Sequence, residues 1–104
     1  MLHYSIVGPY SDAWSKQQKA DLARVIKGHN IVAIFHGHYH LSEHYKWEGF
    51  DVYNVGSPRH ACHTFATVRI TDDELTVASR WWGAQPNRWY WSDRKTITTT
   101  PKPV

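Results

Sequence analysis

The sequence contains a single cysteine, Cys62, so its 104 residues form no internal disulfide bond and depend on an apolar core or a bound metal. It also lacks an apolar run long enough to cross a membrane as a helix. The first residues have neither the basic start nor the long apolar stretch of a signal peptide, so the sequence assigns no localisation. These absences exclude a scaffold built on internal disulfides and a chain built from membrane-spanning helices.

What the chain has in quantity is aromatic side chains, which make up 14% of it and include six tryptophans, while charged residues make up 20%. This composition provides enough apolar surface for a folded domain. The length allows one domain, for which we expect residues 1–92, followed by a C-terminal tail at residues 93–104. The net charge of +3 is compatible with phosphate-bearing ligands and too small to indicate nucleic acid.

The first part of the chain has the pattern of a strand, a helix and a second strand. Residues 2–7 are expected to form the first strand. Ser15 and Gln18 form a Ser-x-x-Gln capping pattern, and an apolar stripe after it continues to Ile26, which predicts a helix. Residues 31–35 are apolar on both faces, as in a strand that is covered on both sides. Together these segments predict a βαβ unit.

The second part of the chain has the pattern of antiparallel strands. Residues 45–47 and 50–55 flank a Glu-Gly pair, which predicts a β-hairpin. Residues 64–70 and 75–81 are predicted to form a second strand pair, joined by a polar turn at residues 71–74. The sequence therefore predicts an α/β fold in which a βαβ unit is followed by antiparallel β-strands.

A cluster of histidines follows the apolar strand predicted at residues 31–35. Alternate residues of an extended segment point the same way, and Gly37 allows the chain to turn sharply. His38 and His40 can therefore reach one cation or two adjacent ones, and neutral imidazoles suit Zn, Fe or Mn. His36, at the end of the buried strand, is better explained as a hydrogen-bonded ring in the core than as a ligand.

The run Gly37-His38-Tyr39-His40 after a hydrophobic strand resembles the G-H-x-H signature of calcineurin-like metallophosphoesterases. His3 occupies the place of the lone metal-binding histidine that ends an earlier strand in that family. The hairpin, the N-V-G-S-P run at residues 54–58 and the strand pair after it also resemble the family's second half, so the resemblance covers residues 2–81. It implies the second half of a four-layer α/β/β/α sandwich.

The activity that this resemblance implies is hydrolysis of a phosphoester by two metal ions, which activate a water molecule and bind the phosphate. The ions are Mn, Fe or Zn; by resemblance His3 and His38 share one of them and His40 binds the other. Arg59 and His60 follow the N-V-G-S-P run and are candidates for holding a phosphate oxygen, with a solvated loop as the alternative. The resemblance does not identify the phosphoester substrate.

The motifs of the family's first half, D-x-H, G-D-x-x-D and G-N-H, do not occur in this sequence. The bridging carboxylate and the catalytic histidine are therefore missing, and no catalytic residue is assigned. Three imidazoles shared by two metals give fewer ligands than a metal site normally has. We therefore expect the C-terminal portion of a longer phosphoesterase, inactive alone, which either a missing N-terminal half or self-association completes.

Two other functions compete with this one. The absent carboxylates favour a non-catalytic metal-binding or interaction remnant of the same fold. A single-stranded nucleic-acid binder would use the Arg-Trp clusters at residues 80–82 and 88–91, and its binding would weaken steeply with salt. Those clusters are better explained as apolar cover for a sheet, so nucleic acid is not an expected partner.

Overall fold

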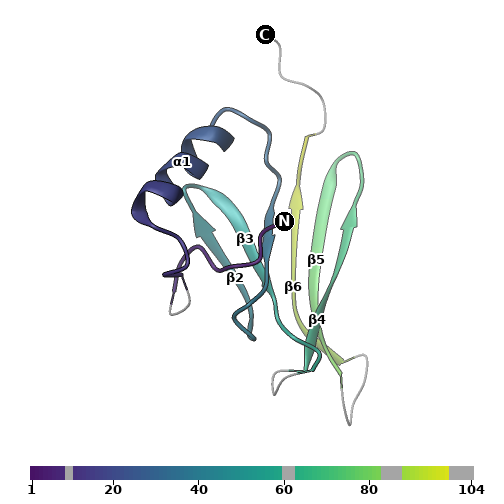
Figure 1. Cartoon of the computed structure of the whole chain (residues 1–104). Helices are drawn as coiled ribbons and strands as arrows, with labels where there is room; N and C mark the ends of the chain where they lie inside the picture. Colours follow the sequence, from purple (N-terminus) through teal and green to yellow (C-terminus); the bar gives the residue numbers. More distant parts are fainter. Residues whose placement is uncertain (9–10, 60–62, 83–87, 99–104) are drawn as a thin grey trace.

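The computed structural model describes residues 1–8, 11–59, 63–82 and 88–98, with residues 88–90 described by their backbone alone. These residues form α1 (Lys16–Ile26), β1 (Ile34–His36), β2 (Ser42–Trp47), β3 (Phe50–Val55), β4 (Thr64–Ile70), β5 (Glu74–Trp81) and β6 (Arg88–Thr96). One sheet has the order β1-β3-β2 and the other has the order β4-β5-β6. The sheets pack face to face and α1 lies on the outer side of the first sheet, which gives three layers (Figure 1).

The first sheet is mixed, because β1 is parallel to β3 and β2 is antiparallel to β3. Strands β2 and β3 form the predicted hairpin, although β2 begins earlier than expected, at Ser42. At the turn, Glu48 has φ 51° and Gly49 has φ 80°. Two consecutive left-handed residues match the twist of a tight hairpin, so the Glu-Gly signal is confirmed.

The second sheet is antiparallel, with β5 in its centre. Strands β4 and β5 confirm the predicted strand pair. Strand β6 was not predicted, and it extends through residues 93–96, into the segment expected as a tail. Its inward side chains include Asp93 and Lys95, which contact β3, so the strand shows no apolar alternation that sequence reasoning would recognise.

The strand expected at residues 2–7 is wrong, because the segment has no regular ladder. Two backbone hydrogen bonds join it to the outer edge of β1, from Leu2 N to Phe35 O at 2.7 Å and from Gly37 N to His3 O at 3.1 Å. Strand β1 has three residues instead of the five expected at residues 31–35, so it offers a short edge for pairing. The predicted βαβ unit therefore lacks its first regular strand.

Helix α1 confirms the prediction made from its capping pattern. The Oγ of Ser15 accepts a hydrogen bond from Gln18 N at 3.0 Å, and the Oε1 of Gln18 accepts one from Ser15 N at 2.8 Å. None of its residues is buried, but Leu22 and Ile26 pack against a small core. The helix is therefore held to the sheet by one side only.

Two small clusters of buried side chains lie between the layers. The outer one consists of Ile6, Ile34 and Val52, between α1 and the first sheet. The inner one consists of Tyr53, Leu75 and Val77, with Phe35 and Trp91 packed against it, and it joins the two sheets. The second helical layer of the predicted four-layer sandwich is not among the described residues and stays a prediction. Nor does the described part of the chain contain a helix of the length and apolarity needed to span a membrane.

Candidate metal centre

His3 and His38, which the sequence assigns to one metal, lie side by side at the end of β1. His38 Nδ1 is 3.2 Å from His3 Nε2, and the ring centroids are 5.1 Å apart. The hydrogen bond from Gly37 N to His3 O ties the two segments together next to the rings, at 3.1 Å. The structure thus brings together two predicted ligands from distant parts of the sequence.

The distance between the two imidazole nitrogens suits a shared metal. Two nitrogens bound to one tetrahedral zinc at ~2.0–2.1 Å are about 3.3 Å apart. A hydrogen bond between one protonated and one free ring nitrogen also fits the observed 3.2 Å. In both cases the rings already face each other, so binding one cation requires little rearrangement.

The backbone and the neighbouring rings hold His38 in an unusual position. His38 has φ 68°, a left-handed conformation that costs free energy for a residue with a side chain. The ring of Tyr4 packs edge-on against His3 at 4.7 Å and against His38 at 4.8 Å. Strained residues of this kind concentrate at functional sites, where the surrounding structure maintains them.

His40, the predicted ligand of the second metal, lies on the loop after β1. It is exposed and lines a hollow of about 440 Å³ together with His38, Tyr39 and Leu41. The structure therefore places His38 and His40 at the same hollow, while His3 contacts His38 directly. The role of His40 as a ligand stays a prediction.

His36 has the structural role expected from the sequence. It is 2% exposed, its Nδ1 is 3.0 Å from Gly37 O and its Nε2 is 2.7 Å from the hydroxyl of Tyr45. Because a carbonyl only accepts, Nδ1 carries the proton and Nε2 accepts from Tyr45. Burial lowers the pKa of His36, which favours this neutral ring. His36 thus anchors the strand end that carries His38.

The N-V-G-S-P run at residues 54–58 contacts the loop that carries His38 and His40. The side chain of Asn54 is fully buried and its Nδ2 donates to Tyr39 O at 2.6 Å. Gly56 has φ 78°, and a Cβ at this position would lie 1.9 Å from Thr64 Oγ1. The run therefore requires glycine, and it acts by holding the loop between His38 and His40.

The predicted phosphate-binding pair is described in part. Arg59 is exposed, and His60 lies outside the described residues. The indole Nε1 of Trp82 donates to Pro58 O at 2.6 Å, and the ring of Trp82 stacks on His63 with centroids 5.4 Å apart. One tryptophan of the Arg-Trp clusters thus fastens this loop, while the binding role of Arg59 and His60 stays a prediction.

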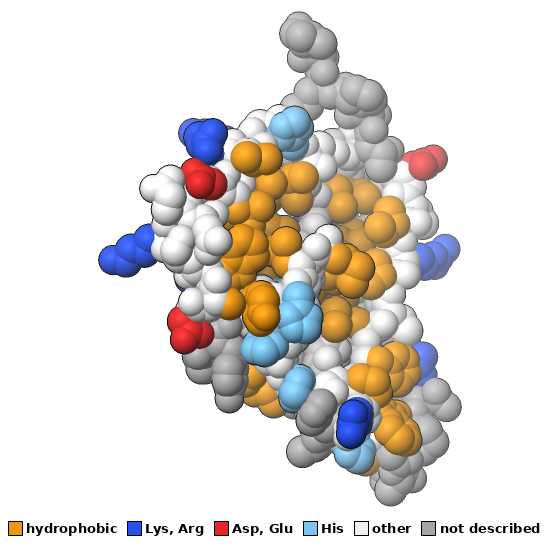
Figure 2. All heavy atoms as spheres, viewed as in Figure 1, with side chains coloured by type: hydrophobic (Ala, Val, Ile, Leu, Met, Phe, Trp, Pro, Cys, Tyr) orange, Lys and Arg blue, Asp and Glu red, His pale blue; other side chains and the backbone are white. Residues whose placement is uncertain are grey.

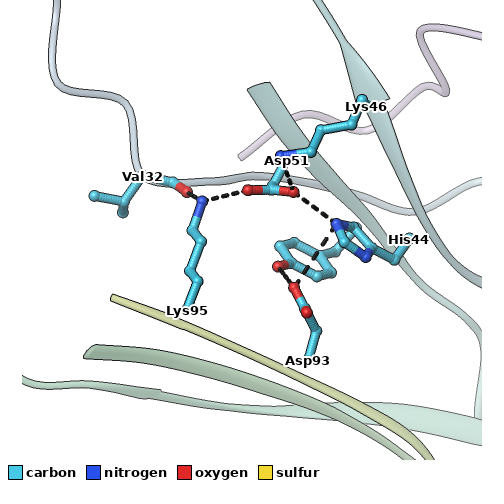
Figure 3. Close-up of polar contacts among 7 residues, drawn as sticks. Val32, His44, Lys46, Asp51, Asp93 and Lys95 are labelled. Atoms are coloured by element: carbon cyan, nitrogen blue, oxygen red, sulfur yellow. Dashed lines mark hydrogen bonds and ion pairs between the residues drawn. The ribbon is translucent and has the colours of Figure 1, made fainter. Parts of the chain in front are cut away.

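A polar network between the two sheets was not predicted (Figure 3). Asp51 on β3 lies at its centre, with Oδ1 at 2.8 Å from both His44 Nε2 and Lys46 Nζ. Its Oδ2 accepts from Lys95 Nζ at 2.5 Å, and the same ammonium donates to Val32 O. Because β2, β3 and β6 all contribute, the network joins the first sheet to the second.

The opposite side of the network contains Tyr53, whose hydroxyl donates to Asp93 Oδ2 at 2.5 Å. Burial raises the pKa of Tyr53, and the hydrogen bond to Asp93 raises it further, so the hydroxyl stays protonated. Burial by itself would raise the pKa of Asp51, but hydrogen bonds from Lys46, Lys95 and His44 outweigh it and hold that pKa well below its usual range.

This network contains a second group of side chains able to ligate a metal. One ligand atom from each of His44, Asp51 and Asp93 lies within 4.8 Å of the others. The charge of Asp51, however, is already balanced by the ammonium groups of Lys46 and Lys95. A cation would have to displace Lys46, so the arrangement favours an ion-pair network over a metal site.

Comparisons with known proteins place this geometry in a known fold. No protein-family profile and no curated protein sequence matches the chain. Over 92% of its length the chain is similar to a single mutant of Vps29 from Entamoeba histolytica, with a TM-score of 0.54 and 19% identity. Over 91% it is similar to wild-type Vps29 complexed with Zn²⁺ from the same organism, with a TM-score of 0.51 and 18% identity.

Vps29 has the calcineurin-like metallophosphoesterase fold. The described chain shares that fold. This agrees with the family resemblance of the G-H-x-H motif and its surroundings. The chain covers 53% and 51% of these two structures, so it spans about half of their length. The assignment to the second half of the fold stays a prediction.

Proposed function

We propose that this chain is the metal-binding half of a dinuclear metallophosphoesterase centre, in which His3 and His38 share one ion and His40 binds the other. The observation that carries the proposal is the 3.2 Å separation of the ring nitrogens of His3 and His38. The Vps29-like fold supports it, because a metallophosphoesterase fold is the context in which G-H-x-H is expected.

The chemistry of these donors decides which ions they suit. Imidazole nitrogens of intermediate softness favour Zn, Fe or Mn over Ca or Mg. Each ring binds in its neutral form, so metal affinity is expected to fall as the rings are protonated. The hydrogen bonds of Asn54 and His36 restrict the loop that carries His38 and His40, which lowers the cost of ordering the ligands.

Two bound ions would supply an activated water molecule and positive charge for a phosphate. This chain contributes the three imidazoles, and Arg59 and His60 are the proposed contacts to a phosphate oxygen. The carboxylate and histidine motifs that would complete the ligand set are absent from the sequence. We therefore propose that the isolated chain binds metal but does not hydrolyse phosphoesters until further polypeptide completes the centre.

Native mass spectrometry of the purified chain with Zn, Mn or Fe tests metal binding. The expected result is specific metal in the wild-type protein that is lost in the variant with His38→Ala and His40→Ala. The matched control carries His44→Gln and Asp93→Asn, which alter the inter-sheet network, and it should keep the metal. Loss of metal in the control alone, or no specific metal in the wild type, would contradict the proposal.

A non-catalytic remnant of the same fold is the second candidate, and the missing carboxylate motifs favour it. Both candidates bind metal, so the metal count does not separate them. The gene separates them, because an upstream reading frame that encodes D-x-H, G-D-x-x-D and G-N-H supports the enzyme. A phosphoesterase assay on that longer protein with p-nitrophenyl phosphate should then show metal-dependent turnover.

A further inference from the structure

The second half of β4 has an inner face that the first sheet leaves uncovered. In the β4–β5 pair, Val68 lies opposite Val77 and Ile70 lies opposite Leu75. Directly opposed residues of antiparallel strands point to the same face. Val77 and Leu75 are 0% and 1% exposed, whereas Val68 and Ile70 are 45% and 57% exposed. The first sheet therefore covers the inner face of β5 but not the part of β4 that carries Val68 and Ile70.

The cause is the narrow first sheet, in which β1 is the edge strand next to this region. Residues 1–7 run beside β1 without forming a strand, and the side chain of Met1 is 99% exposed. A predominantly apolar hollow of about 500 Å³ lies between the sheets, and its lining includes Met1, Phe35, Phe65 and Val68.

We call the region formed by Met1, Phe35, Ala66, Val68 and Ile70 the open face. The space-filling view shows hydrophobic side chains gathered over the side of the molecule that carries the N-terminal segment, with most charged side chains at its margin (Figure 2). A contiguous apolar surface of this kind marks an interaction site. Strand β4 lies at the edge of the second sheet there, and edge strands present backbone groups that pair with another chain.

We propose that the open face binds a second copy of this chain. A two-fold symmetric pair uses the same patch on both copies, and an apolar patch with few charges meets itself without electrostatic repulsion. Size supports this partner, because the matched structures contain about as much polypeptide again as the part that the chain covers, 53% and 51% of their lengths. A second copy therefore has the bulk to cover Val68 and Ile70.

The inference goes beyond the proposed function, because burial of apolar side chains needs no metal. It is tested by sedimentation equilibrium of the full chain in EDTA, which removes any bridging by the histidines. The test variant carries Val68→Lys and Ile70→Lys. The matched control is Val25→Lys, because Val25 is 61% exposed on α1, outside the open face.

The expected result is a dimer for the wild type and the control, and a dissociation constant at least about tenfold higher for the test variant. All three substituted residues are exposed, and circular dichroism with thermal unfolding verifies that each variant is folded. A monomeric wild type, or equal weakening by Val25→Lys, would overturn the proposal and leave the open face to a different polypeptide. A dimer that fails to bind metal would contradict the proposed function alone.

Discussion

At the scale of single residues, Asp51 has the most consequential contacts outside the histidine site. Its side chain is 7% exposed, and it forms ion pairs with Lys46 and Lys95, which lie on two different sheets. Removing one partner of a buried ion pair leaves the others without compensation, which is more costly than the pair is stabilising. Because Lys46 is 64% exposed and can reach water, the lysine at risk is Lys95, which is 28% exposed.

We predict that Asp51→Asn lowers the free energy of unfolding by about 2–3 kcal/mol, at or below the ~3–5 kcal/mol of fully buried pairs, because both lysines are partly exposed. Urea denaturation measures it. The control is Asp21→Asn, which removes the exposed pair with Arg24 and should leave the unfolding free energy unchanged. Equal effects of the two substitutions would show that the inter-sheet network does not stabilise the fold.

The stability difference between the wild type and Asp51→Asn should also change with pH, in a direction that the pKa of Asp51 determines. The pKa of Asp51 in the folded protein is held below its unfolded value by Lys46, Lys95 and His44 against the effect of burial. The stabilisation is therefore complete above the unfolded pKa of about 4 and is lost as the pH falls toward the folded pKa. The stability difference between wild type and Asp51→Asn should shrink below about pH 4, and a constant difference would contradict this account.

At the scale of elements, Gly56, which directly follows β3, shows how one glycine permits a close approach to the first residue of β4. Gly56 and Gly28 have similar φ angles, 78° and 84°, but a Cβ on Gly56 would meet Thr64 whereas one on Gly28 would meet open space. Gly28→Ala thus measures the backbone strain alone, about 1 kcal/mol.

We predict that Gly56→Ala costs about 1–3 kcal/mol more than Gly28→Ala, because the added methyl overpacks a buried contact. Thermal and urea unfolding of the two variants provide the comparison. The variant should also loosen the loop of His38 and His40, since Asn54 in the same run holds Tyr39. Equal destabilisation by the two substitutions would mean that Thr64 moves aside without cost.

Elements with local signals were predictable, and elements that depend on tertiary partners were not. The capping box of α1 and the Glu-Gly turn between β2 and β3 are local, and both are confirmed. Strand β6 was missed because its inward positions include Asp93 and Lys95, which are half-buried and find their partners in Tyr53 and Asp51. Residues 2–7 were overpredicted because β1 has too short an edge to order them as a strand.

The candidate site follows the same rule. The pairing of His3 with His38 was predictable through the resemblance of the G-H-x-H motif, and the structure places the two rings in contact. The network around Asp51 has no motif, since its members come from β2, β3 and β6 and meet only when the sheets pack. Spacing in the sequence contains no signal for a cluster of that kind.

At the scale of the whole molecule, the chain has a layered phosphoesterase-like fold with little core. It matches structures about twice its length over 92% of its own residues, and two small clusters of buried side chains hold its layers. The open face follows from the narrow first sheet, and we propose that a second copy of the chain covers it. The proposed metal centre is incomplete for a different reason, because the carboxylate and histidine motifs are absent from the sequence.

The most direct test of the central claim is the zinc affinity of the chain measured by isothermal titration calorimetry at neutral pH, for the wild type, His3→Ala and His29→Ala. His29 is an exposed histidine in the turn after α1, so its substitution removes an imidazole without touching the site. The account predicts that His3→Ala weakens zinc binding at least about tenfold, as expected for loss of a ligand, while His29→Ala binds as the wild type does. Equal zinc affinity of the wild type and His3→Ala would contradict it.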